Sequence, residues 1–114
     1  MATIKSYTSL EQSKALTKIL PIESADAHYW CKDGNDLRLG GGFSIHKDFD
    51  IPAWSLLALL SSIRIEHKLH GFYNGNENMV YRLETLYAGN SGIYDNPVDA
   101  CYEMIIKLHE QKLL

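Results

Sequence analysis

The sequence predicts an α+β fold in which three helices and two β-hairpins alternate in the order helix, hairpin, helix, hairpin, helix. Two turn dipeptides that favour tight hairpins, Asp33-Gly34 and Asn74-Gly75, each separate two short segments rich in strand-forming residues. A capping box at Ser9 and prolines at positions 52 and 97 precede three segments whose apolar residues have helical character. At 114 residues, the chain is expected to form a single domain over 1–114.

The first helix is expected over residues 9–20. The Ser9 hydroxyl can accept from the backbone N–H of Gln12, while the Gln12 side chain can reach back to Ser9. Leu10, Leu16 and other apolar residues then recur at helical spacing, and Pro21 cannot continue the helix.

The first hairpin is expected from strands at 27–32 and 36–40. Leu37 and Leu39 alternate with Asp36 and Arg38, a pattern that predicts one buried face. The glycines at 40–42 then break the strand. They lack the Gly-Lys-Ser/Thr ending of a phosphate-binding loop, so a turn or bulge is the favoured interpretation.

The second helix is expected within the segment 50–60, near the beginning of which Pro52 favours a helix start, and its apolar residues fall on nearly every side of the helix. Such a helix must be largely buried, and Trp54, Leu57 and Leu60 are predicted to anchor it because they lie near one face.

The second hairpin is expected from strands at 63–73 and 79–87, and the last helix begins with Asn96 as its cap and Pro97 in its first turn. The two hairpins are predicted to form one antiparallel four-stranded sheet with the helices on one face. Whether they share a sheet is left open by the sequence. The predicted core residues are Leu16, Trp54, Leu57, Leu60, Leu83, Val98, Cys101 and Ile105.

The composition argues against several classes of partner and location. A net charge of -3 provides no general attraction for nucleic acid or anionic lipid, so neither is an expected partner. The longest apolar run, residues 56–60, is too short to span a bilayer, and the N-terminal residues lack a signal-peptide pattern. Two cysteines without CxxC spacing indicate reduced thiols, so we expect a soluble, cytoplasmic protein.

The residues with catalytic or metal-binding chemistry do not form a recognisable constellation. His67 and His70 have odd spacing, which places them on opposite faces of a strand, and no further metal ligand lies at a familiar offset. Cys101 falls on the apolar stripe of the last helix, and Cys31 lies beside Trp30 in a strand. The sequence therefore predicts no metal, no cofactor and no enzymatic activity.

Two carboxylate pairs, Asp48 with Asp50 and Asp95 with Asp99, are explained by their positions near expected helix starts.

Two phrases, Pro52-Ala-Trp-Ser-Leu56 and the residues 95–106 (DNPVDACYEMII), resemble small uncharacterised proteins of Bacteroidetes genomes and their phages or mobile elements. Glu23-Ser-Ala-Asp26 fits the same family. The resemblance extends from about Leu16 to the C-terminus and implies a phage or mobile-element origin. These segments contain helix starts, core anchors and caps, so the resemblance assigns no catalytic residue to this sequence.

The favoured functional hypothesis is a non-enzymatic module that binds protein, either as a homodimer or as an accessory subunit. Twelve aromatic residues, seven of them tyrosines, supply contact area of the kind common at protein interfaces. The alternative is a small-ligand or nucleic-acid-binding domain. Its site would be framed by His28, Trp30 and Arg38, or would follow a positive stripe along Arg64 and Lys68. Tyr81 is a further candidate for the interaction or ligand surface, since rings on strands can stack on bases.

Overall fold

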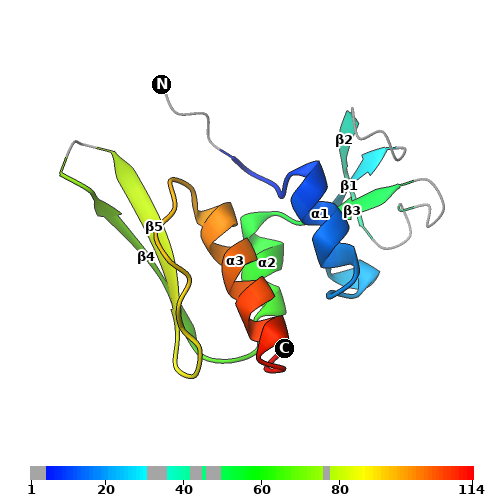
Figure 1. Ribbon diagram of the computed structural model, residues 1–114. Coiled ribbons are helices and arrows are strands. Elements are labelled where there is room, and N and C mark those ends of the chain that lie inside the picture. The colour runs from blue at the N-terminus through cyan, green and yellow to red at the C-terminus, as the bar shows by residue number, and fades with distance from the viewer. Residues whose placement is uncertain (1–4, 31–35, 42–44, 46–49, 76–77) are drawn as a thin grey trace. The chain divides into compact units, whose positions relative to one another are not determined.

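The computed structural model describes residues 5–30, 36–41, 45, 50–75 and 78–114. Within these residues the fold is α+β, with three α-helices, one short 3₁₀ helix at Ile22–Ser24 and two three-stranded antiparallel sheets (Figure 1). The chain divides into two compact units. One comprises Ser6–Ala58, and the other comprises Met1–Lys5 together with Leu59–Leu114. The predicted order of helices and hairpins is broadly retained.

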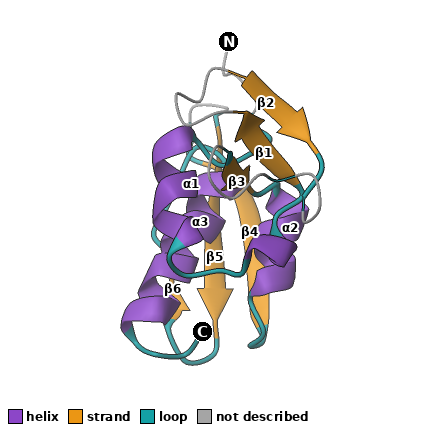
Figure 2. Ribbon diagram, turned by 90° about the vertical axis from the view of Figure 1, so that its right-hand side faces the viewer, coloured by secondary structure: helices purple, strands orange, loops and turns teal. Residues whose placement is uncertain are grey.

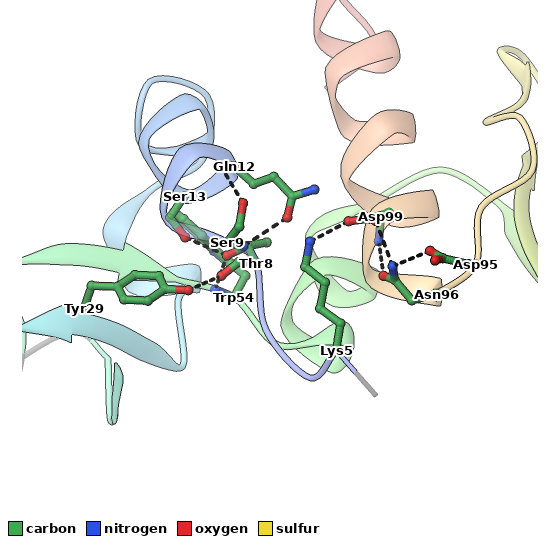
Figure 3. A network of polar contacts seen from close by, with 10 residues as sticks. All are labelled: Lys5, Thr8, Ser9, Gln12, Ser13, Tyr29, Trp54, Asp95, Asn96 and Asp99. Atoms are coloured by element: carbon green, nitrogen blue, oxygen red, sulfur yellow. Dashed lines mark hydrogen bonds and ion pairs between the residues drawn. The ribbon is translucent and has the colours of Figure 1, made fainter. Parts of the chain in front are cut away.

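The first helix, α1 (Leu10–Thr17), begins where its capping box predicts. The backbone N–H of Gln12 donates to Ser9 Oγ at 3.2 Å, and the backbone N–H of Ser9 donates to Gln12 Oε1 at 3.0 Å (Figure 3). The helix ends three residues earlier than predicted, because the backbone turns at Lys18 and its N–H bonds back to Ala15. The capping box therefore predicted the start of α1 more accurately than the spacing of apolar residues predicted its end.

The first sheet has the strand order β2-β1-β3. Strands β1 (Ala27–Trp30) and β2 (Asp36–Leu39) form the predicted hairpin, with Ala27 opposite Leu39 and Trp30 opposite Asp36. The turn predicted at Asp33-Gly34 lies outside the described residues. Strand β3 (Ile51–Ala53) pairs with the other side of β1, with Ala27 opposite Ala53.

The start of the second helix was predicted wrongly. Pro52 lies in β3 rather than in a first helical turn, and α2 (Leu56–Ser62) begins four residues later. The ring of proline fixes φ at a value that suits an edge strand as well as a helix start, so the sequence alone did not distinguish the two. The Ser55 hydroxyl, which accepts from the backbone N–H of Ala58 at 3.2 Å, provides the cap.

The second sheet has the strand order β4-β5-β6. Strand β4 (His67–Tyr73) starts four residues later than predicted, and β5 (Met79–Thr85) ends two residues earlier. The chain then turns, and β6 (Gly89–Asn90), which was not predicted, pairs with the end of β5. Figure 2 shows α3 (Pro97–Glu110) lying over β5, which it contacts.

The predicted four-stranded sheet is not observed, because the two hairpins lie in separate three-stranded sheets. Strand β3 pairs with the second side of β1, and β6 pairs with the second side of β5 at the end of that strand.

The α3 helix begins as predicted. Asn96 Oδ1 accepts from the backbone N–H of Asp99 at 2.8 Å, and Pro97 occupies the first turn. Lys5 Nζ donates to Asp99 Oδ1 at 2.6 Å, so Lys5 is tied to the start of the last helix (Figure 3). Among the described residues, no helix is long and apolar enough to cross a membrane.

The core contains most of the residues that were predicted for it. Leu57 is the exception: its side chain is 73% exposed, and the prediction was wrong because the helix that was to orient it starts after Trp54. Leu60 is only half-buried. The predicted core residues that are fully buried are Leu16, Trp54, Leu83, Val98, Cys101 and Ile105.

Candidate interaction edge

Three of the predicted surface residues, His28, Trp30 and Arg38, come together on one face of the β1–β2 hairpin. His28 and Arg38 are directly opposite each other, and Trp30 follows two residues after His28 on the same side of the strand. Arg64, Lys68 and Tyr81 belong to the other unit. Lys68 is opposite Glu84, and Tyr81 lies three positions from Glu84, so Lys68 and Tyr81 are on opposite faces of that sheet and do not form one surface.

Arg38 is held over the indole of Trp30. Its Cζ lies 4.2 Å from the ring centroid, and its Nε donates to Asp36 Oδ2 at 3.1 Å. A guanidinium over an indole face is a favourable cation–π geometry, and the neighbouring carboxylate fixes the side chain from a second direction. Trp30 is 48% exposed, so the stacked pair lies at the surface of the hairpin.

His28 does not frame a concave site with these two residues. Its side chain is buried, and Nδ1 lies 2.9 Å from the carbonyl oxygen of Gly40, to which a protonated Nδ1 donates. The Ser6–Ala58 unit has a groove of about 400 Å³, but its lining residues are not His28, Trp30 and Arg38. They are Lys14, Thr17, Lys18 and Ile51. Lys14, Thr17 and Lys18 are exposed and Ile51 is half-buried, so no buried polar group is among the residues that line this groove.

The backbone of β2 has a defined inner and outer edge. The N–H of Gly40 donates to the carbonyl of Asp26 at 3.0 Å, which marks these two residues as a hydrogen-bonded pair of the antiparallel ladder. Because such pairs recur at every second residue, Arg38 and Asp36 also bond to β1. The N–H and C=O groups of Leu37 and Leu39 consequently point away from β1.

All four residues of β2 are exposed, and Leu39 is 75% exposed. The prediction that Leu37 and Leu39 lie on a buried face was therefore wrong. In the described part of the chain, β2 is the outermost strand of its sheet, so two leucines and their backbone groups line an open edge.

The opposite edge of this sheet is closed. Since Ala27 and Tyr29 point away from β2, they pair with β3, and Pro52 stands opposite His28 with its backbone nitrogen on the outer side. Proline has no N–H to offer there, and Pro52 is buried. The sheet can therefore accept another strand at β2 but not in the same way at β3.

The solvent-facing residues of β4 and β5 form a second surface. Lys68 is opposite Glu84 and His70 is opposite Arg82, whose Cζ lies 5.9 Å from the centroid of the Phe72 ring. Within the described chain, His70 Nε2 and Arg82 Nε are buried and make no hydrogen bond, although His70 Nε2 lies 3.6 Å from Glu84 Oε2.

The predicted stripe of Arg64 and Lys68 is not continuous along a strand, because Arg64 precedes β4. Tyr81 is bonded through its backbone to Tyr94, at 2.7 and 2.8 Å, and its ring lies beside Gly71. A Cβ built on Gly71 would lie 3.2 Å from Tyr81 Cε1, so this ring is packed against the sheet and is not positioned as a free stacking platform.

The residues with catalytic chemistry have structural roles where they are described. Cys101 is fully buried, and burial raises the pKa of its thiol to about 12, which makes it a poor nucleophile at neutral pH. Asp95 and Asp99 both accept from the side-chain amide of Asn96, at 3.0 and 2.7 Å. Cys31 and Asp48 lie outside the described residues. No group of three metal-ligating side chains occurs among the residues that are described.

The comparisons with family models, curated proteins and solved structures give no match to this chain.

Proposed function

We propose that this protein is a non-enzymatic interaction module that joins another polypeptide by strand addition at the edge of β2. The observation that carries the proposal is the alignment of the Leu37 and Leu39 backbone groups along an exposed outer edge. An extended segment placed beside β2 would receive hydrogen bonds from these groups, while side chains on alternate sides would supply specificity.

The side chains of β2 support this use because each face offers a different contact. Leu37 and Leu39 lie on the face that also carries Ala27 and Tyr29, and Arg38 lies on the face that carries Trp30. Natural sheets commonly protect exposed edges with proline, bulges or a covering segment. The β3 edge carries such protection at Pro52, whereas β2 carries none among the residues that the structure describes.

The experiment is a titration of isotope-labelled protein with a short blocked peptide of alternating valine and threonine, a generic strand that needs no knowledge of the natural partner. We expect the amide signals of Leu37 and Leu39 to shift and their hydrogen exchange to slow, because these are the donors that face outward. A second peptide of the same length, with two adjacent prolines in its centre, is the control, since it lacks central donors on both edges.

The matched variant is Leu37→Pro, which removes one outward donor but none of the donors to β1. It should keep the hairpin and lose peptide binding. If the peptide shifts amides elsewhere, or shifts none up to about 1 mM, β2 is not a docking edge.

A second candidate function is binding of single-stranded nucleic acid on the β4–β5 surface. It is favoured by one observation, the unbonded Arg82 Nε beside the Phe72 ring, because cations and exposed rings together recognise phosphates and bases. We expect Arg82→Ala to weaken binding of a labelled oligothymidylate about tenfold, measured by fluorescence anisotropy at low salt. Lys14→Ala, an exposed cation in the other unit, is the control. Equal and weak binding of the oligonucleotide by the wild type, Arg82→Ala and Lys14→Ala would exclude this function.

We also propose a phage or mobile-element origin and a cytoplasmic location. The support for the origin is the resemblance in residues 52–56 and 95–106, and the support for the location is the expectation of reduced cysteines. Integrase or phage structural genes beside the coding sequence would support the origin, whereas conserved chromosomal neighbours in many species would oppose it. Cell fractionation tests the location.

A further inference from the structure

We infer that the strand which docks on β2 is β2 of a second copy of this chain, running antiparallel about a two-fold axis that passes beside Leu37. This inference rests on the proposed function of β2 as a docking edge. It adds the identity of the partner and the residues that lie opposite each other.

The backbone of β2 fits this axis. Leu37 is one of the residues whose N–H and C=O face outward, so two copies of Leu37 can form a hydrogen-bonded pair in which each donates to the other. A closed two-fold contact of this kind uses the same patch on both copies and leaves no further edge of the same type open. The result is a continuous sheet with the order β3-β1-β2-β2-β1-β3.

The charges of β2 complement themselves about this axis. Asp36 of each copy stands opposite Arg38 of the other, and within each copy Arg38 already bonds to Asp36 at 3.1 Å. The four side chains lie on one face of the joined strands and alternate in sign around a square. Each guanidinium also rests on its own Trp30 at 4.2 Å, so Arg38 is held at the position that the second carboxylate needs.

The neighbouring axes fit less well. An axis beside Arg38 would place the two Arg38 side chains directly opposite each other, and like charges in that position destabilise a strand pair. An axis beside Leu39 would place Arg38 opposite Gly40, with no charge pair at all. The axis beside Leu37 also packs Leu37, which is 39% exposed, against its own copy on the other face.

Disulfide formation locates the axis directly. In a Cys31→Ser background, the single substitutions Leu37→Cys, Arg38→Cys and Leu39→Cys place one thiol at successive positions. Cys101 stays in place because it is buried and its pKa is raised to about 12, which keeps it unreactive. The Cα atoms of the two copies are separated by about 5.5 Å at position 37, roughly 8 Å at 38 and roughly 14 Å at 39. Only the first distance suits a disulfide.

We expect mild oxidation to link Leu37→Cys into a dimer at least tenfold faster than the other two variants. The Cys31→Ser protein without an added thiol is the control. Faster linkage at 38 or 39 would overturn the inferred axis, even if the protein is a dimer.

Charge exchange tests the same pairing in solution. Arg38→Asp should weaken self-association about tenfold or more, measured by light scattering over a concentration series, because it replaces two attractive pairs by repulsion. Adding Asp36→Arg to the same chain restores the alternation and should restore dimerisation. Lys14→Asp, which changes the net charge equally, should have little effect.

The failure of this inference differs from the failure of the proposed function. If the wild-type chain remains a monomer up to about 1 mM while the valine–threonine peptide still binds at Leu37 and Leu39, the edge docks a different protein and only the inferred partner is wrong. If neither association occurs, both are wrong.

Discussion

The thiol of Cys101 is a sensitive reporter of its surroundings, because it is fully buried in the apolar stripe of α3. Its pKa is raised from 9.0 to about 12 by burial. Below pH 9 the thiol is protonated in the folded and unfolded states alike. Between pH 9 and about 12 only the unfolded state ionises, so stability falls as pH rises.

From this shift, we expect the free energy of unfolding to fall by roughly 1 kcal/mol per pH unit above pH 9, measured by urea unfolding. Tyr29, Tyr94 and Tyr102 are partly buried, and the pKa values of their hydroxyls are also raised by desolvation, so they add to the fall at higher pH. Cys101→Ala should be less stable at pH 7, but its stability should depend less on pH between 9 and 10. An unchanged pH dependence in this variant would show that the thiol does not titrate as described.

Gly41 and Gly75 are required for different reasons, and the cost of substituting each by alanine distinguishes these reasons. A Cβ on Gly41 would lie 1.8 Å from the carbonyl oxygen of Ala25, which is backbone and cannot yield, whereas a Cβ on Gly75 would meet nothing within 4 Å. Gly75 instead has a φ of +94°, which disfavours any other residue. We expect Gly75→Ala to cost about 1 kcal/mol and Gly41→Ala at least twice as much, in thermal unfolding. Equal costs would show that the close approach at Gly41 relaxes easily.

At the scale of elements, helix caps were the most predictable features of the fold. Ser9 and Asn96 cap α1 and α3 through hydrogen bonds to the backbone N–H groups of Gln12 and Asp99. We expect Ser9→Ala and Asn96→Ala each to lower stability by about 1 kcal/mol, measured by urea unfolding. Ser61→Ala, at an exposed position in α2, should change stability by less than about 0.5 kcal/mol. A cap variant as stable as this control would indicate that tertiary packing alone holds the helix end.

The caps were predictable because their signal depends on residues three positions apart. Strand β3 was not predictable in the same way, since its formation depends on pairing with β1, and Pro52 is compatible with both structures. The short β6 was missed for a similar reason, because Gly89–Asn90 has no strand-forming side chains and is held by β5. Long-range pairing therefore decided the elements that local patterns misplaced.

The sequence predicted only part of the interaction edge. Trp30 and Arg38 were named as surface residues, and the structure places them in contact. Leu37 and Leu39 were assigned to a buried face because alternation shows that two faces differ but not that either is covered. The outward direction of their N–H groups follows from the strand register, which an isolated sequence does not specify.

At the scale of the whole molecule, α2 is divided between the two compact units. Leu56–Ala58 belong to one, and the remaining residues of the helix belong to the other. A helix of seven residues has little stability alone, so the loss of either part should destabilise the rest. This shared helix favours the expectation that the chain unfolds as a single cooperative domain.

The two tryptophans allow this expectation to be tested, because Trp30 and Trp54 both lie in the Ser6–Ala58 unit. In a Cys31→Ser background, reagent labelling of Cys101 reports on the other unit. We expect tryptophan fluorescence and Cys101 labelling to give the same urea midpoint. Two separate midpoints would mean two independently folding domains.

The ion pair between Lys5 and Asp99 joins residues 94 positions apart in the chain. During synthesis, the ribosome releases Ser6–Ala58 as an unbroken stretch, so all internal partners of that unit are available before β4 has been made. The other unit has to wait, because Lys5 is synthesised before Ser6–Ala58 and meets Asp99 only after α3 has begun to leave the exit tunnel. The internal contacts of Ser6–Ala58 should therefore begin to form first on the ribosome, and they should reach full stability only after Leu59–Leu114 has emerged.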